Sequence, residues 1–118
     1  MTDPKWIRVV STTEVKEAGG LLGRSVSGVA LAVYEADGAY FVTSDICTHG
    51  QANLSDGYLE DFLIECPYHQ GKFDVRTGEV AGAPCTEPVC TFPVRHDGDD
   101  LFVSLDAIEK FKNEQPAS

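Results

Sequence analysis

The sequence predicts an all-β protein, a small antiparallel sandwich or barrel with a short helix near its C-terminal end. Short segments in which apolar and polar residues alternate dominate the 118 residues, as strands with one buried face require. Turn-forming pairs that end in glycine separate these segments at short intervals, whereas helical periodicity is scarce. The length and the ordinary composition, 42% hydrophobic and 24% charged, predict one folded domain.

Five segments carry the strand pattern, each rich in β-branched, aromatic or leucine side chains. In chain order they are residues 6–10, 29–35, 40–43, 62–65 and 101–105. The turn pairs are Ser27-Gly28, Asp37-Gly38, Asp56-Gly57, Thr77-Gly78 and Asp97-Gly98. Short strands separated by such turns predict a sandwich or barrel.

Two short helices are predicted, one near each end of the chain. Residues 12–18 allow one or two turns before a pair of glycines ends them. Towards the other end, Asp106 and Glu109 form a capping pair that opens a helix over residues 107–112. We expect a single domain over residues 1–112, with its functional loops within 45–88, and a flexible tail over 113–118.

The charge of the chain excludes two classes of partner. Nine Lys and Arg against nineteen Asp and Glu leave a net charge of −10, without any basic run. Nucleic acid and anionic membrane surfaces attract the opposite charge, so neither is expected to bind. The longest apolar run, residues 29–34, is far shorter than the roughly 20 residues of a membrane span.

The N-terminus carries an acid, Asp3, and leads into alternation instead of an apolar signal core, so we expect a cytoplasmic protein. The acidic surface has two interpretations. It keeps the protein soluble, or it attracts a basic protein partner.

Residues 45–88 differ from the rest, because strand signals thin out there while glycine, proline, cysteine and histidine concentrate. Two motifs in this stretch pair a cysteine with a histidine: Cys-Thr-His at 47–49 and Cys-Pro-Tyr-His at 66–69, with sixteen residues between them. Such a set can hold a structural zinc ion, although Cys-x-His is tighter than the usual zinc spacings. It can also hold a 2Fe–2S cluster in which cysteines bind one iron and histidines bind the other.

The stretches CTHGQANLSDGYL and ECPYHQGKFDVRTGEVAGAP resemble the ligand loops of the Rieske proteins in order, spacing and flanking residues. The resemblance implies the Rieske fold, with its cluster-binding loop subdomain and one Rieske-type 2Fe–2S cluster. It assigns Cys47 and Cys66 to an inner, buried iron, and His49 and His69 to an outer iron near the tip. Two thiolates with two neutral imidazoles leave the cluster less negative than four thiolates would, which raises its potential.

Residues around the motifs extend the resemblance. Pro84 matches the proline-bearing loop that covers the cluster in this family. Gly50, Gly57 and Gly71 would let the backbone approach closely enough for amide N–H groups to hydrogen-bond the sulfurs. The alternative is that they are ordinary turn glycines, and it stays open above all for Gly57 in its Asp-Gly pair.

Departures from the respiratory Rieske proteins predict a low reduction potential. Ala52 and Tyr68 stand where those proteins carry the two cysteines of a bracing disulfide, and Gly71 and Phe73 stand where they carry hydroxyl groups. Two lost hydrogen bonds to a charged cluster, at roughly 1.5–3 kcal/mol each, lower the potential by about 100–250 mV. This places the cluster toward the low end of the Rieske range, at about −150 mV.

The remaining histidine and cysteines do not complete a second metal site. A Rieske oxygenase needs a mononuclear iron, generally held by two histidines and a carboxylate. Only His96 is left, and it is expected to be a solvated residue beside a turn. We therefore expect an electron carrier without catalytic residues. Cys85 and Cys90 are expected to be buried free thiols, with a disulfide across their short loop as the alternative.

A free-standing, acidic, low-potential Rieske chain of this length resembles the ferredoxins of aromatic-ring dioxygenase systems, and the naphthalene-type ferredoxins in particular. The resemblance implies a monomeric one-electron carrier between an NADH-dependent flavin reductase and a terminal oxygenase with its own Rieske centre and mononuclear iron. The alternatives are a Rieske-type subunit of another redox enzyme, such as a small nitrite reductase component, and a zinc-binding interaction module.

The ligand and proline loops are expected to form the docking tip around the exposed histidines. The docking residues are Gln51, Tyr68, Gln70 and Pro84. Nearby acids are expected to steer a basic partner, at rates that fall as salt rises. These acids are Asp45, Asp56, Glu60 and Asp61.

Overall fold

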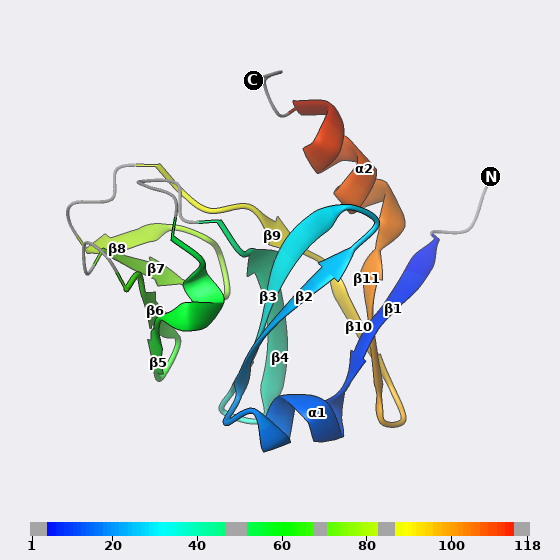
Figure 1. Ribbon diagram of the computed structural model, residues 1–118, viewed down its shortest axis with the longest axis horizontal. Coiled ribbons are helices and arrows are strands. Elements are labelled where there is room, and N and C mark those ends of the chain that lie inside the picture. Colours follow the sequence, from blue (N-terminus) through cyan, green and yellow to red (C-terminus); the bar gives the residue numbers. More distant parts are fainter. Residues whose placement is uncertain (1–4, 47–51, 68–70, 83–86, 115–118) are drawn as a thin grey trace.

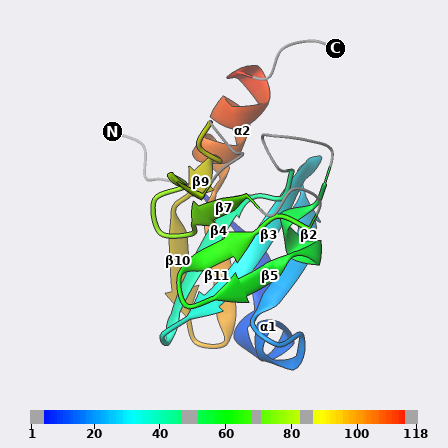
Figure 2. The ribbon, with the colours of Figure 1, turned by 90° about the vertical axis from the view of Figure 1, so that its left-hand side faces the viewer.

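Three antiparallel sheets make up the part of the chain that the computed structural model describes, residues 5–46, 52–67, 71–82 and 87–114. A central four-stranded sheet lies between a three-stranded sheet on one side and a second four-stranded sheet on the other (Figure 1). Turned by 90°, the second four-stranded sheet lies in front of the central one (Figure 2). The arrangement confirms the predicted all-β class with a short C-terminal helix.

Most strands are short. The three-stranded sheet, in the order β1-β11-β10, contains β1 (Trp6–Ser11), β10 (Val94–Asp97) and β11 (Asp100–Ser104). The central sheet, in the order β2-β3-β4-β9, contains β2 (Leu21–Val26), β3 (Val29–Ala36), β4 (Ala39–Ser44) and β9 (Thr91–Phe92). The second four-stranded sheet, in the order β5-β6-β7-β8, contains β5 (Tyr58–Glu60), β6 (Leu63–Glu65), β7 (Lys72–Asp74) and β8 (Val80–Gly82). The helices are α1 (Thr12–Glu17), the 3-10 helix η1 (Leu54–Asp56) and α2 (Leu105–Glu114).

Two-residue turns connect the central hairpins, as the sequence predicts. Ser27-Gly28 joins β2 to β3 with φ angles of 52° and 84°, and Asp37-Gly38 joins β3 to β4 with 53° and 80°. Positive φ at both residues is the type I′ pattern, whose twist matches that of the paired strands. These turns therefore set the register of the central sheet.

Strand β3 is buried on both faces, which explains the longest apolar run in the sequence. Leu31 and Val33 belong to one apolar cluster, together with residues of β1, β11 and α2. The alternate residues Ala32 and Tyr34 belong to a second cluster, which includes Leu54 of η1 and residues of β6 and β7. The central sheet thus separates two cores, and the second core supports the predicted ligand loops.

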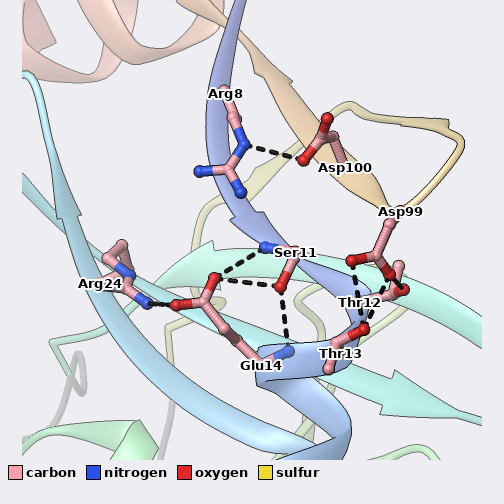
Figure 3. A network of polar contacts seen from close by, with 8 residues as sticks. All are labelled: Arg8, Ser11, Thr12, Thr13, Glu14, Arg24, Asp99 and Asp100. Atoms are coloured by element: carbon pink, nitrogen blue, oxygen red, sulfur yellow. Dashed lines mark hydrogen bonds and ion pairs between the residues drawn. The ribbon is translucent and has the colours of Figure 1, made fainter.

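A capping box begins α1. The Ser11 hydroxyl accepts a hydrogen bond from the Glu14 N–H, and the Glu14 carboxylate accepts one from the Ser11 N–H (Figure 3). These hydrogen bonds lower the pKa of Glu14. In the same network the Asp99 carboxylate accepts hydrogen bonds from the hydroxyls of Thr12 and Thr13. The contacts fasten α1 to the β10–β11 hairpin.

All five predicted strands are confirmed, and each end agrees to within one residue. Six further strands, β2, β5, β7, β8, β9 and β10, are not among the predicted segments. In β2, three consecutive exposed residues, Gly23, Arg24 and Ser25, interrupt the alternation. The other five strands have two to four residues each, which shows a period of two poorly.

The C-terminal helix is confirmed, but its predicted cap is wrong. Ser104 is the capping residue, because its Oγ accepts a hydrogen bond from the Ala107 N–H at 3.2 Å. The helix begins at Leu105, places Asp106 in its first turn and ends at Glu114, two residues beyond the predicted end. The domain boundary at residue 112 stays a prediction. Within the described ranges, no helix is both long and apolar enough to cross a membrane.

A buried pair of hydroxyl groups ties β3 to β4. The Tyr34 hydroxyl lies 2.9 Å from Thr43 Oγ1, and the Thr43 hydroxyl donates to the Ser44 carbonyl, also at 2.9 Å. The Tyr34 hydroxyl is therefore the donor to Thr43. Both residues are fully buried, and burial raises the pKa of Tyr34.

We expect Thr43→Val to lower the free energy of unfolding by about 1–3 kcal/mol, because the Tyr34 hydroxyl would stay buried without its acceptor. The double variant Tyr34→Phe/Thr43→Val should recover part of this loss, since it removes the orphaned hydroxyl. Urea unfolding followed by circular dichroism measures both effects. A double variant less stable than Thr43→Val would contradict the assignment.

Candidate metal centre

The two predicted ligand motifs follow strands of different sheets. Strand β4 ends three residues before Cys47 in the sequence, and β6 ends directly before Cys66. Of the four predicted ligands, the structure describes Cys66, whereas Cys47, His49 and His69 lie outside the described residues.

Cys66 has the surroundings expected of a ligand to an inner iron. It is fully buried, with 0% exposure, and its N–H donates to the Gly71 carbonyl at 2.8 Å. It belongs to the second core cluster, together with Ala52, Leu54 and Phe73. Cysteine binds the iron of such a cluster as a thiolate, and the metal compensates its charge. A buried thiolate donor at the end of a rigid strand therefore fits the inner iron of a 2Fe–2S cluster.

Asp45 has a structural position instead of the predicted surface position. It is only 5% exposed, and its carboxylate accepts hydrogen bonds from the Ser55 N–H and the Ser55 hydroxyl at 2.7 and 2.9 Å. Burial raises the pKa of Asp45, while the hydrogen bonds from Ser55 act in the opposite direction. The prediction that Asp45 steers a partner is wrong, because its charge is turned inward toward Ser55.

Gly57 is required by a close backbone contact. A Cβ atom at this position would lie 2.0 Å from the Glu65 carbonyl oxygen. Its φ angle is −89°, so the requirement is one of space and not of a left-handed conformation. Gly57 is thus more than an ordinary turn glycine, and its described contact is with the strand that precedes Cys66.

Gly71 and Phe73, which stand where the respiratory proteins carry hydroxyl groups, belong to the surroundings of Cys66. Gly71 accepts the hydrogen bond from the Cys66 N–H, and Phe73 is fully buried in the same core cluster. Phe73 also pairs with Ile64 across β6 and β7. Neither residue has a side chain that can donate a hydrogen bond.

The three other predicted steering acids are exposed. Asp56 ends η1, Glu60 ends β5, and Asp61 follows it with a positive φ of 55°. Tyr58 on the same strand is 70% exposed. This edge of the β5–β8 sheet thus combines negative charge with an exposed aromatic ring.

A groove of about 870 Å³ opens beside the start of the first ligand segment. Ile46, which is 47% exposed, lines it together with Phe111 of α2.

Cys90 lines the same groove, as a free and exposed thiol. Partial burial and the nearby Glu114 carboxylate raise the pKa of Cys90, so it stays a thiol at neutral pH. The prediction that Cys90 is buried is wrong, and Cys85 lies outside the described residues.

His96, the histidine outside the two ligand motifs, lies on β10. Its ring is exposed and makes an edge contact with the ring of Tyr40 at a centroid distance of 5.2 Å. Within the described ranges, no group of three or more His, Cys, Asp or Glu side chains is placed to hold a metal ion. The predicted docking residues Gln51, Tyr68, Gln70 and Pro84 lie outside those ranges.

Sequence reasoning missed the Asp45–Ser55 contact and the groove beside Ile46. For the first, the sequence shows only that an acid and a serine lie on either side of the Cys-Thr-His motif. Nothing in the sequence pattern distinguishes an inward carboxylate from a solvated one. The groove arises from α2, which lies far from Ile46 in the sequence.

Comparison with known proteins places this arrangement among redox proteins. The family model of the Rieske 2Fe-2S domain matches residues 5–93. The chain is 46% identical over 101 residues to the ferredoxin component of the naphthalene 1,2-dioxygenase system of Pseudomonas aeruginosa, covering 86% of this chain and 96% of the relative.

Solved structures of ferredoxins are also similar to this chain. The ferredoxin of Sphingomonas yanoikuyae B1 superposes with a TM-score of 0.79 at 38% identity, over 85% of this chain and 98% of that chain. A chain from the complex of reduced oxygenase and oxidized ferredoxin in carbazole 1,9a-dioxygenase superposes with a TM-score of 0.76 at 36% identity, over 86% of this chain and 94% of that chain.

Proposed function

The chain belongs to the Rieske 2Fe-2S domain family, and from this premise we propose that it serves as the ferredoxin of an aromatic-ring hydroxylating system. One observation carries the proposal, the 46% identity over nearly the full length of a naphthalene dioxygenase ferredoxin component. The carbazole complex pairs such a ferredoxin with its oxygenase. The chain is an electron-transfer component that binds one Rieske-type cluster and delivers electrons to an oxygenase, and it is not itself the catalytic subunit.

We infer that the electron donor is an NADH-dependent flavin reductase. The acceptor would be a terminal oxygenase that holds its own Rieske centre and a mononuclear iron, with an aromatic ring as substrate. A monomer that diffuses between the two in the cytoplasm suits this exchange.

The proposed ligands are Cys47 and Cys66 for the inner iron and His49 and His69 for the outer iron. When bound, the cluster accepts one electron and gives it up again. The role of Cys66 is to hold the inner iron at a fixed position at the second core, away from water. The histidines would give the electron a short path to a partner at the docking tip, around Gln51, Tyr68, Gln70 and Pro84.

The apolar surroundings of Cys66 support a low potential. Phe73 belongs to the same buried cluster as Cys66 and offers no hydroxyl, and Gly71 has no side chain to donate one. The reduced state carries one more negative charge, so each missing donor disfavours reduction. We propose a potential of about −150 mV, at the low end of the Rieske range.

The exposed acids support a basic partner surface. Glu60 and Asp61 lie at the end of the edge strand β5, and Asp56 ends the preceding helix η1, in a chain with a net charge of −10. Opposite charge on the partner would speed the encounter more than it would strengthen the final complex.

Electron delivery is the first prediction of the proposed function. Protein reduced with dithionite and mixed in a stopped-flow instrument with the oxygenase component of a naphthalene dioxygenase should be reoxidised. The second-order rate should fall as ionic strength rises, because salt screens exposed charges. Glu60→Gln/Asp61→Asn should lower the rate several-fold at low salt, with Glu17→Gln, an exposed acid on α1, as the matched control.

Two failures of this experiment have different meanings. Protein that stays reduced in the presence of the oxygenase would contradict electron delivery itself. Reoxidation that does not respond to salt or to the double variant would contradict only the steering role of the β5–β8 edge.

Restoring a hydroxyl should raise the potential. Gly71→Ser places a donor where the respiratory proteins carry one, and one hydrogen bond to a charged group, at roughly 1.5–3 kcal/mol, corresponds to about 65–130 mV. Gly71→Ala is the control, because it adds the Cβ without the hydroxyl. Protein-film voltammetry compares the midpoint potentials. Equal potentials for the serine and alanine variants would contradict the hydrogen-bond explanation.

A further inference from the structure

We propose that Asp45 is a positioning residue for the metal ligands: through Ser55 it fixes both ends of the segment that carries Cys47 and His49. The short helix η1 then links this segment to the strand that leads to Cys66. The inference rests on the ligand set in the proposed function, and it extends that set to residues that touch no metal.

Asp45 makes four hydrogen bonds that join three parts of the chain. Its N–H donates to the Ala30 carbonyl on β3 at 2.9 Å, and its own carbonyl accepts the Leu54 N–H at 2.6 Å. Its carboxylate accepts both Ser55 donors, through separate oxygens, at 2.7 and 2.9 Å. The ten-residue interval from Asp45 to Ser55 is thereby closed at its base.

A second pair of residues, which lies inside the Asp45–Ser55 pair in the sequence, also joins the two ends of this interval. Ile46 and Asn53 form an isolated antiparallel bridge. The segment that contains two of the four proposed ligands therefore starts and ends at paired backbone, held to the central sheet through Ala30. A loop closed in this way has fewer conformations available before the metal binds.

Gly23 of strand β2 lies against the Asp45–Ser55 contact, which we call the clamp. A Cβ atom at Gly23 would lie 2.6 Å from Ser55 Oγ and 3.3 Å from Asp45 Oδ2. Any side chain at position 23 would therefore displace the serine from the carboxylate. The absence of a side chain there leaves room for the Asp45–Ser55 contact, and this accounts for a glycine that interrupts the alternation of β2.

The other end of η1 lies close to β6, the strand that precedes Cys66. The Gly57 N–H donates to the Leu54 carbonyl at 2.9 Å, and a Cβ atom at Gly57 would lie 2.0 Å from the Glu65 carbonyl oxygen. Glu65 directly precedes Cys66. The three residues of η1 thus form a short strut, held by Asp45 at one end and by β6 at the other.

Metal clusters are sensitive to such supports, because ligands must be held close to their productive geometry. Groups that orient ligands without touching the metal typically change metal affinity by 10–100-fold when removed. The strut connects the base of the first ligand segment to β6, the strand that leads to Cys66.

The test compares four variants of the whole, cluster-loaded protein. Asp45→Ala removes the clamp. Ser55→Ala removes the hydroxyl donor but keeps the backbone N–H. Asp45→Asn removes the charge but can still accept the Ser55 N–H and donate to the Ser55 hydroxyl. Asp56→Ala, an exposed acid on the same strut, is the matched control for lost charge.

Iron release to a chelator and the line shape of the reduced electron paramagnetic resonance signal are the measurements. Asp45→Ala should release iron roughly tenfold faster or more, with broadened lines that report variable ligand geometry. Ser55→Ala should show a smaller increase in the release rate. Asp45→Asn and Asp56→Ala should behave like the wild-type protein, which separates the clamp from a simple effect of charge.

Three results would overturn the inference: release from Asp45→Ala at the wild-type rate, release from Asp45→Asn as fast as from Asp45→Ala, or no increase for Ser55→Ala. Should Asp45→Ala not fold, the comparison of Ser55→Ala with Asp56→Ala decides. Absence of a Rieske-type signal in the wild-type protein would instead contradict the proposed function, so the two failures are distinguishable.

Discussion

Burial of both faces of β3 is the constraint on which the rest of the structure depends. Its alternate residues belong to two separate apolar clusters. A shift of the strand by one residue would therefore move the residues of each cluster into the other. The neighbouring strands take their register from β3 through the type I′ turns. At the start of β3, the Ala30 carbonyl accepts the Asp45 N–H. The position of the first ligand segment therefore follows from apolar packing in the central sheet.

The second core and the surface have complementary roles in an electron carrier. Cys66 and Phe73 are fully buried in the second core, so the surroundings of the described ligand are apolar. Negative charge lies outside, on the exposed Glu60 and Asp61. In the proposed function, the apolar interior would lower the potential, whereas the acidic exterior would affect the encounter rate. Each property can change without the other, which suits a small electron-transfer protein.

The sequence predicts most of what depends on local pattern and little of what depends on long-range contact. Alternation predicts five strands, β1, β3, β4, β6 and β11, and the spacing and neighbours of the ligand motifs are enough to indicate the family. The cap at Ser104 is missed because Asp106 is an equally good capping residue, and the choice depends on where β11 ends. Asp45 looks like a surface acid because charge is visible in a sequence and burial is not. Cys90 is misjudged for the converse reason, since an apolar neighbourhood in sequence does not guarantee a buried thiol.

The most direct test of the central claim is an electron paramagnetic resonance spectrum of the purified protein after dithionite reduction, with the midpoint potential titrated on the same sample. The proposed ligand set predicts a Rieske-type signal, from two histidines on one iron, and a midpoint of about −150 mV. A colourless protein that contains zinc and gives no signal would contradict the ligand assignment and the electron-transfer function together. A Rieske signal with a potential several hundred millivolts higher would leave the cluster in place and contradict the argument from Gly71 and Phe73.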